Sequence, residues 1–135
     1  MRITYSYDPA STPLVNYTYD RWGRLATTSQ GGGTATLTYN DANQFTGESY
    51  AGGTLGGLSV TAGYNPQLQR EWLAGGGFAG YGLAYTYDAS GRLWTVNDGT
   101  SIFTYGYVPS SMLVQTVSSS DTAENLTSTR SYDSL

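Results

Sequence analysis

Two copies of one heptapeptide decide the fold, Tyr19-Asp20-Arg21-Trp22-Gly23-Arg24-Leu25 and Tyr87-Asp88-Ala89-Ser90-Gly91-Arg92-Leu93. An Asp side chain accepts hydrogen bonds from backbone amides two or three residues later, and this starts a type I turn. A Gly three residues after the Asp supplies the positive φ that closes a three-residue hairpin loop with a bulge. The heptapeptides therefore predict β-hairpins, with positive φ at Gly23 and Gly91.

A shorter motif repeats along the whole chain. Its centre is a tyrosine. In the clearest copies the residue two positions before this tyrosine is also aromatic, and the residue after it is usually Asp or Asn. The tyrosine lies at positions 7, 19, 39, 64, 87, 107 and 132, so that after the first step the period is 20 to 25 residues. The motif residues are Tyr7, Asp8, Tyr17, Tyr19, Asp20, Tyr39, Asn40, Tyr64, Asn65, Tyr85, Tyr87, Asp88, Tyr105, Tyr107, Tyr132 and Asp133. A fixed period of this length is typical of repeat architectures.

The tyrosine pairs have strand spacing. Residues i and i+2 of a strand point to one face, so we expect Tyr17 with Tyr19, and Tyr85 with Tyr87, to share a face and to stack on adjacent repeats. The chain has 13 Tyr and 18 Gly. Tyr and Thr favour strands and Gly favours turns. The sequence therefore predicts an all-β fold of antiparallel hairpins that turn after Asp8, Asp20, Asn40, Asn65, Asp88 and Val108.

The degraded copies predict different turns. Asn43 replaces the turn glycine, and Asn tolerates positive φ. Ser11, Leu68 and Ser111 occupy the same position and fit it poorly, so those three turns are expected to have another shape.

Between the hairpins, glycine marks the connections. The runs at 31–33, 52–53, 56–57 and 75–77 are expected to be loops at the opposite margin of the sheet. Asn97-Asp98-Gly99 is a tight hairpin signal. The best helical candidate, Gln67 to Leu73, is flanked by Pro66 and a glycine run, so no helix is expected.

The full motif, Tyr-Asp-x-x-Gly-Arg-Leu, resembles the YD repeats of bacterial Rhs proteins, insecticidal toxin complexes and teneurins. The resemblance covers essentially the whole chain. It implies one continuous, spiralling or solenoid-like sheet that forms a hollow shell around a toxic domain or, in teneurins, supports cell adhesion. It also implies a secreted or cell-surface protein. Residues 1–135 are then a single array of six to seven hairpins, a part of a larger protein or one unit of an assembly.

Composition argues against several classes of function. The formal charge is −4 and the six basic residues are dispersed arginines, which does not suit nucleic-acid binding. The chain has no His and no Cys, and these are needed for the common nucleophilic triads and most transition-metal sites. No apolar run approaches the 18 residues or so of a membrane span. We therefore expect neither an enzyme nor a cofactor.

The remaining polar residues have structural and functional interpretations. Carboxylates could form a glycosidase pair or a calcium site, but turn formation accounts for the repeated Asp. Arg24 and Arg92 are expected to pair with Asp across strands or to contact Tyr through cation–π interactions. The indoles of Trp22, Trp72 and Trp94 leave a sugar-binding surface as a third function.

Two other functions depend on the ends of the array. Residues 2–7 and 127–132 are predicted edge strands that pair with further repeats of a parent chain or with identical copies. The first arrangement gives a shell wall that encloses a toxin or other cargo, and the second gives an extracellular fibre or adhesion element.

Overall fold

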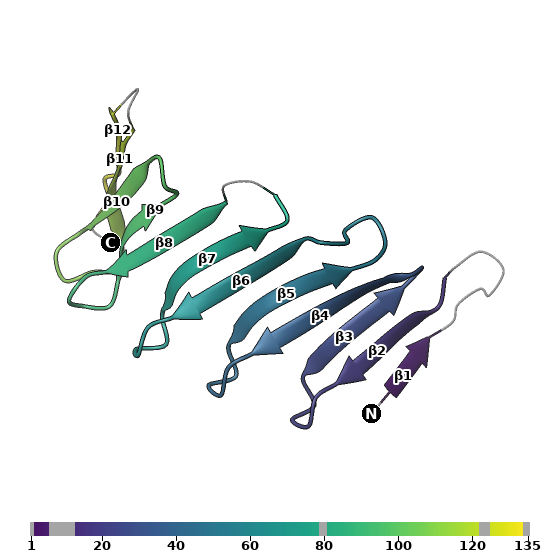
Figure 1. The fold of residues 1–135 in the computed structure, drawn as a ribbon. Helices are drawn as coiled ribbons and strands as arrows, with labels where there is room; N and C mark the ends of the chain where they lie inside the picture. Colours follow the sequence, from purple (N-terminus) through teal and green to yellow (C-terminus); the bar gives the residue numbers. More distant parts are fainter. Residues whose placement is uncertain (1, 6–12, 79–80, 122–124, 134–135) are drawn as a thin grey trace. The chain divides into compact units, whose positions relative to one another are not determined.

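The computed structural model describes residues 2–5, 13–78, 81–121 and 125–133. These residues form strands joined by turns, as the alternating sequence predicts (Figure 1). The strands are β1 (Arg2–Tyr5), β2 (Val15–Tyr19), β3 (Leu25–Gln30), β4 (Gly33–Tyr39), β5 (Phe45–Ala51), β6 (Ser59–Tyr64), β7 (Arg70–Gly76), β8 (Gly82–Tyr87), β9 (Leu93–Asn97), β10 (Ile102–Tyr107), β11 (Val114–Ser120) and β12 (Asn125–Thr129).

The strand order is the chain order. The sheet runs from β1 to β12 without a crossover, and the pairs of strands with a defined register are antiparallel. The predicted all-β sheet of antiparallel hairpins is thus confirmed, and it is an open meander rather than a closed barrel. The chain divides into two compact units, residues 1–63 with 74–81 and residues 64–73 with 82–135, which are considered separately below.

The hairpins turn where the motif predicts. Turns follow β2, β4, β6, β8 and β10 at Asp20, Asn40, Asn65, Asp88 and Val108. The predicted turn after Asp8, and with it Tyr7 and Ser11, lies outside the described residues. The helical candidate Gln67 to Leu73 forms part of a turn and the start of β7 instead.

The opposite margin carries the glycine connections, with two corrections. Gly33 begins β4, while Gly75 and Gly76 end β7, so these three glycines belong to strands and not to loops. At two of them a side chain would meet a neighbour: a Cβ on Gly75 would collide with the Phe78 ring, and one on Gly76 with the Ser59 hydroxyl. The Asn97-Asp98-Gly99 signal does form the hairpin between β9 and β10, where the Asp98 amide bonds to the Ser101 carbonyl at 3.2 Å.

Each unit has one aromatic face and one hydroxyl face. In the first unit, the register aligns Thr18, Thr27, Thr36, Ser49 and Ser59 directly across β2 to β6. Because side chains alternate along a strand, the residues on either side of Thr18, which are Tyr17 and Tyr19, lie together on the other face.

The second unit repeats this design. Thr86, Thr95, Thr104, Ser118 and Thr127 form the corresponding row across β8 to β12. Hydroxyls within the rows bond to each other, at 2.6 Å for Thr18 with Thr27 and at 2.6 Å for Thr86 with Thr95. The predicted sharing of a face by Tyr85 and Tyr87 follows from this register.

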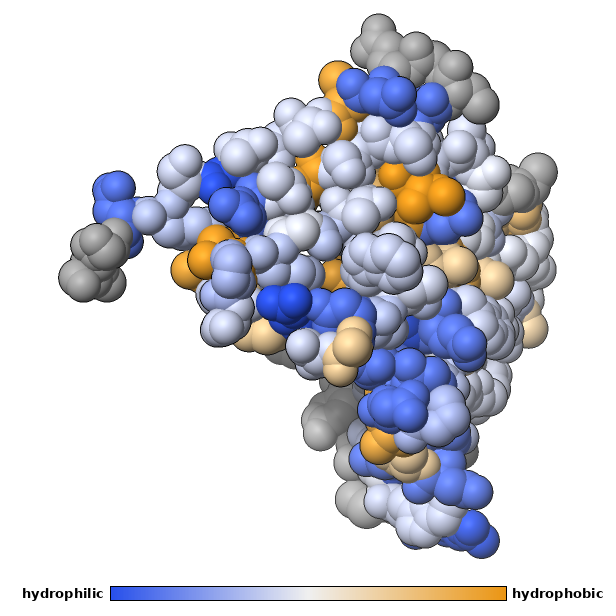
Figure 2. Space-filling model, turned by 90° about the vertical axis from the view of Figure 1, so that its left-hand side faces the viewer, coloured by the Kyte–Doolittle hydropathy of each residue, from blue (hydrophilic) through white to orange (hydrophobic). Residues whose placement is uncertain are grey.

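A single-layer sheet leaves almost no interior. Ala62, at 4% exposure, is the one apolar side chain that is buried among the described residues. Large apolar side chains remain accessible, for example Trp22 at 54% and Met112 at 74%, and Figure 2 shows apolar residues as separate patches among hydrophilic ones. Stability must therefore come mainly from contacts between neighbouring hairpins.

Candidate functional site: a ladder of hairpin turns

The turn at Asp20 shows the chemistry that its sequence predicts. The Asp20 carboxylate accepts hydrogen bonds from the backbone amides of Trp22 (2.8 Å) and Arg24 (3.0 Å). Two backbone bonds close the loop, from the Gly23 amide to the Asp20 carbonyl (3.0 Å) and from the Asp20 amide to the Arg24 carbonyl (2.9 Å). The predicted positive φ at Gly23 is confirmed at 79°.

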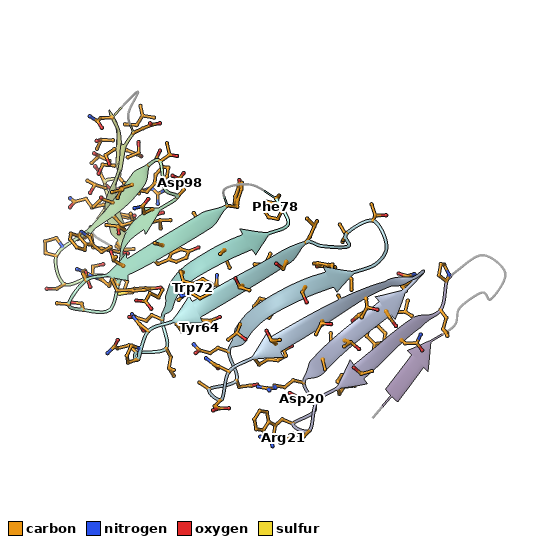
Figure 3. All side chains as sticks on the ribbon, in the orientation of Figure 1. Asp20, Arg21, Tyr64, Trp72, Phe78 and Asp98 are labelled. Carbon is orange, nitrogen blue, oxygen red and sulfur yellow. The ribbon has the colours of Figure 1, made fainter. Side chains whose placement is uncertain are left out.

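The turn at Asp88 has the same geometry. Its carboxylate accepts the amides of Ser90 (2.9 Å) and Arg92 (3.0 Å), and φ of Gly91 is 76°. Figure 3 labels Asp20 at the turn after β2, where the carboxylate is aimed into its own loop. The Asp residues at these two turns are therefore occupied by the turns that they form.

Each Asp also forms an ion pair with the arginine four residues later. The Nε of Arg24 lies 2.6 Å from the Asp20 carboxylate, and the Nε of Arg92 lies 2.7 Å from that of Asp88. Partial burial raises the pKa of Asp20, but the Arg24 guanidinium and the backbone amides outweigh this effect and lower the pKa below its ordinary value. The pKa of Asp88 is lowered mainly by the backbone amide of Arg92, with further help from its guanidinium.

Two other turns make the same contacts with neutral side chains. Asn40 accepts the Gln44 amide at its Oδ1 (2.9 Å) and donates its Nδ2 to the Gln44 Oε1 (2.9 Å). Asn65 and Gln69 repeat this arrangement at 2.9 and 3.0 Å. The sequence analysis missed both glutamines. Their position, four residues after the turn Asn and equivalent to the motif arginine, was the signal that could have found them.

The turn at Asn65 also corrects one expectation. Leu68 stands where the motif has glycine, and it was expected to give a turn of another shape. Instead Leu68 takes φ 63°, and the loop closes as in the other copies, from the Asn65 amide to the Gln69 carbonyl (2.9 Å). The Asn65–Gln69 contacts hold the loop in this form although leucine is an unfavourable residue at positive φ. Asn43 has φ 62°, as predicted.

The side chain four residues after the turn Asp or Asn also reaches the next turn along the chain. Arg24 donates from one terminal nitrogen to the Asn40 carbonyl (3.2 Å) and to the Asn43 Oδ1 (3.1 Å). In the second unit, Gln69 donates to the Gly91 carbonyl at 2.8 Å.

Arg92 donates forward in the same way, to the Ser111 carbonyl at 2.7 Å. One side chain thus closes its own turn and binds the following one. We call this series of contacts the turn ladder.

Aromatic rings complete the turn ladder. The Arg24 guanidinium carbon lies 4.5 Å from the centres of both the Trp22 and the Tyr39 rings, and that of Arg92 lies 4.4 Å from the Tyr107 ring. These distances are typical of cation–π contacts. The Arg21 guanidinium also lies over Trp22, at 4.2 Å, so two cations contact this indole, which remains 54% exposed.

The motif tyrosines connect the hairpins in the reverse direction. The Tyr39 hydroxyl donates to the carbonyl of Leu25, the first residue of β3, at 3.1 Å. The same bond forms in the second unit from Tyr87 to Arg70 (2.8 Å), from Tyr107 to Leu93 (2.7 Å) and from Tyr132 to Val114 (2.7 Å). Tyr64 also forms a hydrogen bond with the Arg70 side chain, and this bond raises the pKa of that arginine. These bonds join the motif tyrosines to neighbouring hairpins, and the stacking of tyrosine rings on adjacent repeats stays a prediction.

The turn after β10 departs from the pattern, as expected for Ser111. It is one residue longer: the Val108 amide bonds to the Leu113 carbonyl (3.0 Å), and Ser110 has φ 55°. Val108 has no side-chain oxygen to organise the loop, and the Ser111 hydroxyl accepts the Leu113 amide instead (3.0 Å). Met112 at the tip is largely exposed.

The hollows on the surface are open and shallow. One of about 450 Å³ is lined by the glycine connections and Tyr50, whose hydroxyl donates to Glu48 at 2.6 Å and whose pKa is raised by that carboxylate. Another of about 610 Å³ is lined by residues such as Gln69, Tyr87 and Asp88. The described residues contain no group of three or more metal-binding side chains. They also contain no helix long and apolar enough to cross a membrane.

Comparisons with known proteins identify the fold. No family model and no curated protein matches the chain. Two crystal structures match over 95% of it: that of TcdB2-TccC3-Cdc42, with a TM-score of 0.67 and 13% identity, and that of TcdB2-TccC3-TEV, with a TM-score of 0.68 and 14% identity. The chain spans only 8% and 9% of the lengths of those two chains. The resemblance expected from the repeats is thus matched in three dimensions, and the chain has the fold of a short segment of TcdB2-TccC3.

Proposed function

We propose that this chain is a non-catalytic, structural segment of a YD-repeat array, and that the array forms part of an Rhs-like shell around a toxin or other cargo. One observation carries the proposal: nearly all of the chain follows the fold of a small part of the much longer TcdB2-TccC3. A sheet of hairpins that matches a small fraction of a much longer protein suits a wall element.

The turn ladder supports a structural role for the motif residues. The Asp, Asn and Gly residues form turns, the Arg and Gln side chains join consecutive turns, and tyrosine hydroxyls join consecutive hairpins. Nothing in this arrangement requires a substrate. The proposed role includes a single array over residues 1–135 and a secreted or cell-surface location.

The near absence of buried apolar side chains from the described residues also supports a role within a larger assembly. A sheet with an apolar face is stable when another layer covers that face. Here the tyrosine face is only half-buried, for example at Tyr17 and Tyr85. A shell supplies the missing contacts through further repeats and its contents.

The test is a chimaera. The segment of TcdB2-TccC3 that aligns with this chain is replaced by residues 1–135, and the product is compared with unmodified TcdB2-TccC3 by electron microscopy and by resistance to added protease. We expect unchanged particle dimensions and protease resistance. The control carries Gly23→Val and Gly91→Val, which disrupt two turns and reduce both. If the unaltered segment gives particles that are as defective as those of the control, the proposed role is wrong.

The edge strands favour a second candidate, an extracellular fibre. β1 and β12 are the terminal strands of the sheet order, and a terminal strand leaves one row of backbone groups available for pairing. Identical copies that pair head to tail without closing would give a filament.

A further inference from the structure

We propose that Asp98 is a site of spontaneous isomerisation to isoaspartate, and that the hairpin between β9 and β10 suppresses this reaction as long as it stays closed. Asn97 is the positioning residue that blocks the reaction. The inference concerns the chemical durability of the backbone and does not depend on the function proposed above.

The reactive element is the dipeptide Asp98-Gly99. Asp98 is the one aspartate of the sequence that is followed by glycine. The backbone nitrogen of the residue after an aspartate can attack the carboxyl carbon of its side chain, and a side chain on that residue hinders the attack. Glycine has no Cβ and the widest choice of backbone angles, so it hinders the attack least. A Cβ on Gly99 would have no neighbour within 4 Å, so the nitrogen lies in open surroundings.

The reaction needs no co-reactant except water. The Gly99 nitrogen forms a bond with Cγ of Asp98, and one carboxyl oxygen leaves as water together with the carboxyl proton and the amide proton. The product is a succinimide ring. Water then adds to the main-chain carbonyl carbon of Asp98, and the bond from that carbon to the Gly99 nitrogen breaks. The backbone now runs through the side-chain carbons, and the former carbonyl has become a free carboxylate.

The attacking nitrogen is engaged in the structure. The Gly99 amide donates to Oδ1 of Asn97 at 2.7 Å. Attack requires loss of the amide proton, and the negatively charged nitrogen would then face an oxygen that can only accept a hydrogen bond. The φ of Gly99 is 89°, which glycine adopts without strain. Asn97 therefore keeps the proton on this nitrogen and fixes the direction in which it points.

The carboxyl group that would be attacked is also held in place. Oδ1 of Asp98 accepts the Thr100 amide at 2.9 Å and the Ser101 amide at 2.7 Å. These bonds direct the carboxyl group toward the residues that follow Gly99. They also lower the pKa of Asp98, the Ser101 amide most strongly. The group therefore stays ionised, and a carboxylate is a poorer electrophile than the neutral acid.

Isomerisation would destroy the hairpin that prevents it. Figure 3 labels Asp98 at the connection between β9 and β10, where its amide closes the loop on the Ser101 carbonyl at 3.2 Å. An isoaspartate adds a carbon to the main chain inside this loop, and its side-chain carboxyl group, which accepted two amides, becomes part of the backbone. A single opening of the hairpin can thus be made permanent by the reaction.

The experiment follows isoaspartate at Asp98 in the full chain at neutral pH. One sample is kept under native conditions and the other is kept unfolded in guanidinium chloride. A proteinase that cuts before aspartate but not before isoaspartate then digests both samples. Mass spectrometry measures the fraction left uncut at Asp98, with cutting at Asp20 and Asp88 as the reference.

We expect the native chain to react at least about tenfold more slowly than the unfolded chain, because three hydrogen bonds must break before the ring can close. Equal rates in the two samples, or no isoaspartate in the unfolded chain, overturn the proposal.

The positioning role of Asn97 is tested under native conditions. Asn97→Ala removes the acceptor of the Gly99 amide, and we expect isoaspartate to form about fivefold faster. Asn97→Asp keeps an acceptor oxygen at the same place and is expected to restore the slow rate. An aspartate variant that reacts as fast as the alanine variant would show that this acceptor does not block the reaction.

The matched control is Thr95→Ala. It removes the hydroxyl bond with Thr86, which is 2.6 Å long, from the same strand and leaves the loop unchanged. If Thr95→Ala accelerates the reaction as much as Asn97→Ala does, Asn97 acts only through the stability of the hairpin, and the role assigned to it is wrong.

A second measurement separates the geometry of the loop from the charge of Asp98, and it does not depend on the folding of the Asn97 variants. Asp98→Asn keeps an Oδ1 acceptor for the Thr100 and Ser101 amides, and the same ring then forms with loss of ammonia in place of water. We expect this variant also to react at least about tenfold more slowly under native conditions than in guanidinium chloride. Equal rates would show that the closed hairpin does not block ring closure.

Discussion

Leu68 occupies a backbone conformation that is costly for leucine. Its φ is 63°, in the left-handed region, where residues other than Gly, Asn and Asp are strained by about 1–2 kcal/mol. The side chain is 57% exposed, so little packing compensates for the strain. The Asn65–Gln69 contacts and the closing backbone bond must supply the difference.

The strain at Leu68 predicts opposite effects on stability for two substitutions, one that removes a side chain at positive φ and one that adds it. Leu68→Gly is expected to stabilise the chain by about 0.5–1 kcal/mol, because the relief of strain exceeds the added entropy of the unfolded chain. Gly23→Val is expected to destabilise it by about 1 kcal/mol or more, because the same strain is introduced there. Denaturant titrations of the two variants and the parent measure both. A destabilising effect of Leu68→Gly would show that the leucine side chain makes a contact of greater value.

The hydrogen bonds that motif tyrosines donate to the preceding hairpin can be tested at Tyr107, again with a matched pair of variants. Tyr107→Phe removes the donor to the Leu93 carbonyl and leaves that carbonyl unsatisfied in a part-buried site, with an expected cost of about 1 kcal/mol. The control is Tyr105→Phe, because the Tyr105 hydroxyl has no hydrogen bond to the described residues. If both variants unfold at the same denaturant concentration, the Tyr107 bond contributes no stability.

The two charged pairs make stability depend on pH. The pKa values of Asp20 and Asp88 are lowered in the folded chain, so their contribution is present above the unfolded-state value of about 3.9 and is lost as the pH falls through the lower folded values. Asp20→Asn with Arg24→Gln and Asp88→Asn with Arg92→Gln copy the neutral pairs found at Asn40 and Asn65.

We expect this fourfold variant to lose less stability than the parent between about pH 5 and pH 2. Thermal unfolding at several pH values provides the comparison. A variant with the same acid dependence as the parent would show that other carboxylates, such as Asp98, whose pKa backbone amides also lower, dominate acid unfolding.

At the scale of strands and turns, most of the fold could be predicted from the sequence. Strand positions and most turns follow from Asp, Asn, Gly and Tyr-x-Tyr spacing, because turn formation and side-chain alternation are local. The extents of the glycine strands were not predictable, because they depend on distant neighbours: a Cβ on Gly76 would meet the Ser59 hydroxyl, 17 residues away along the chain. The hydrogen bonds from Gln69 and Arg92 to the following turn likewise depend on which two turns are neighbours. The register between strands decides this, and the sequence of a single repeat does not contain it.

The glycine margin of the first unit offers a test at the same scale. A Cβ on Gly52 would collide with the carbonyl oxygen of Gly32, whereas one on Gly32 itself would meet open space, and both residues have positive φ. Gly52→Ala is expected to cost at least about 1 kcal/mol more than Gly32→Ala, because only the former forces two loops apart. Equal costs in chemical denaturation would mean that the connections adjust freely.

At the scale of the molecule, the part of the chain that the structure describes buries almost no apolar side chain, and this directs attention to the edges of the sheet. The outer sides of β1 and β12 offer backbone groups for pairing. Residues 2–5 of the predicted edge strand 2–7 form β1, and residues 6 and 7 lie outside the described residues. The predicted edge strand 127–132 is observed as Asn125–Thr129. Outer strands that carry few charges invite further pairing.

We therefore expect the isolated chain to associate as its concentration increases. Light scattering or sedimentation from micromolar to millimolar concentration measures this, and growth without a fixed stoichiometry would favour the fibre. A chain that stays monomeric throughout, with both outer strands protected from hydrogen exchange, would show that its edges are already satisfied.

The hydrogen bonds between consecutive hairpins also have a consequence for the rate of folding. The side-chain bonds that join consecutive hairpins link residues only 14 to 22 positions apart, from Tyr39 with Leu25 to Gln69 with Gly91. Chains whose contacts are close in sequence fold faster than all-β proteins with distant pairings. Each hairpin can therefore pack against the one before it as soon as both have left the ribosome, without waiting for the rest of the chain.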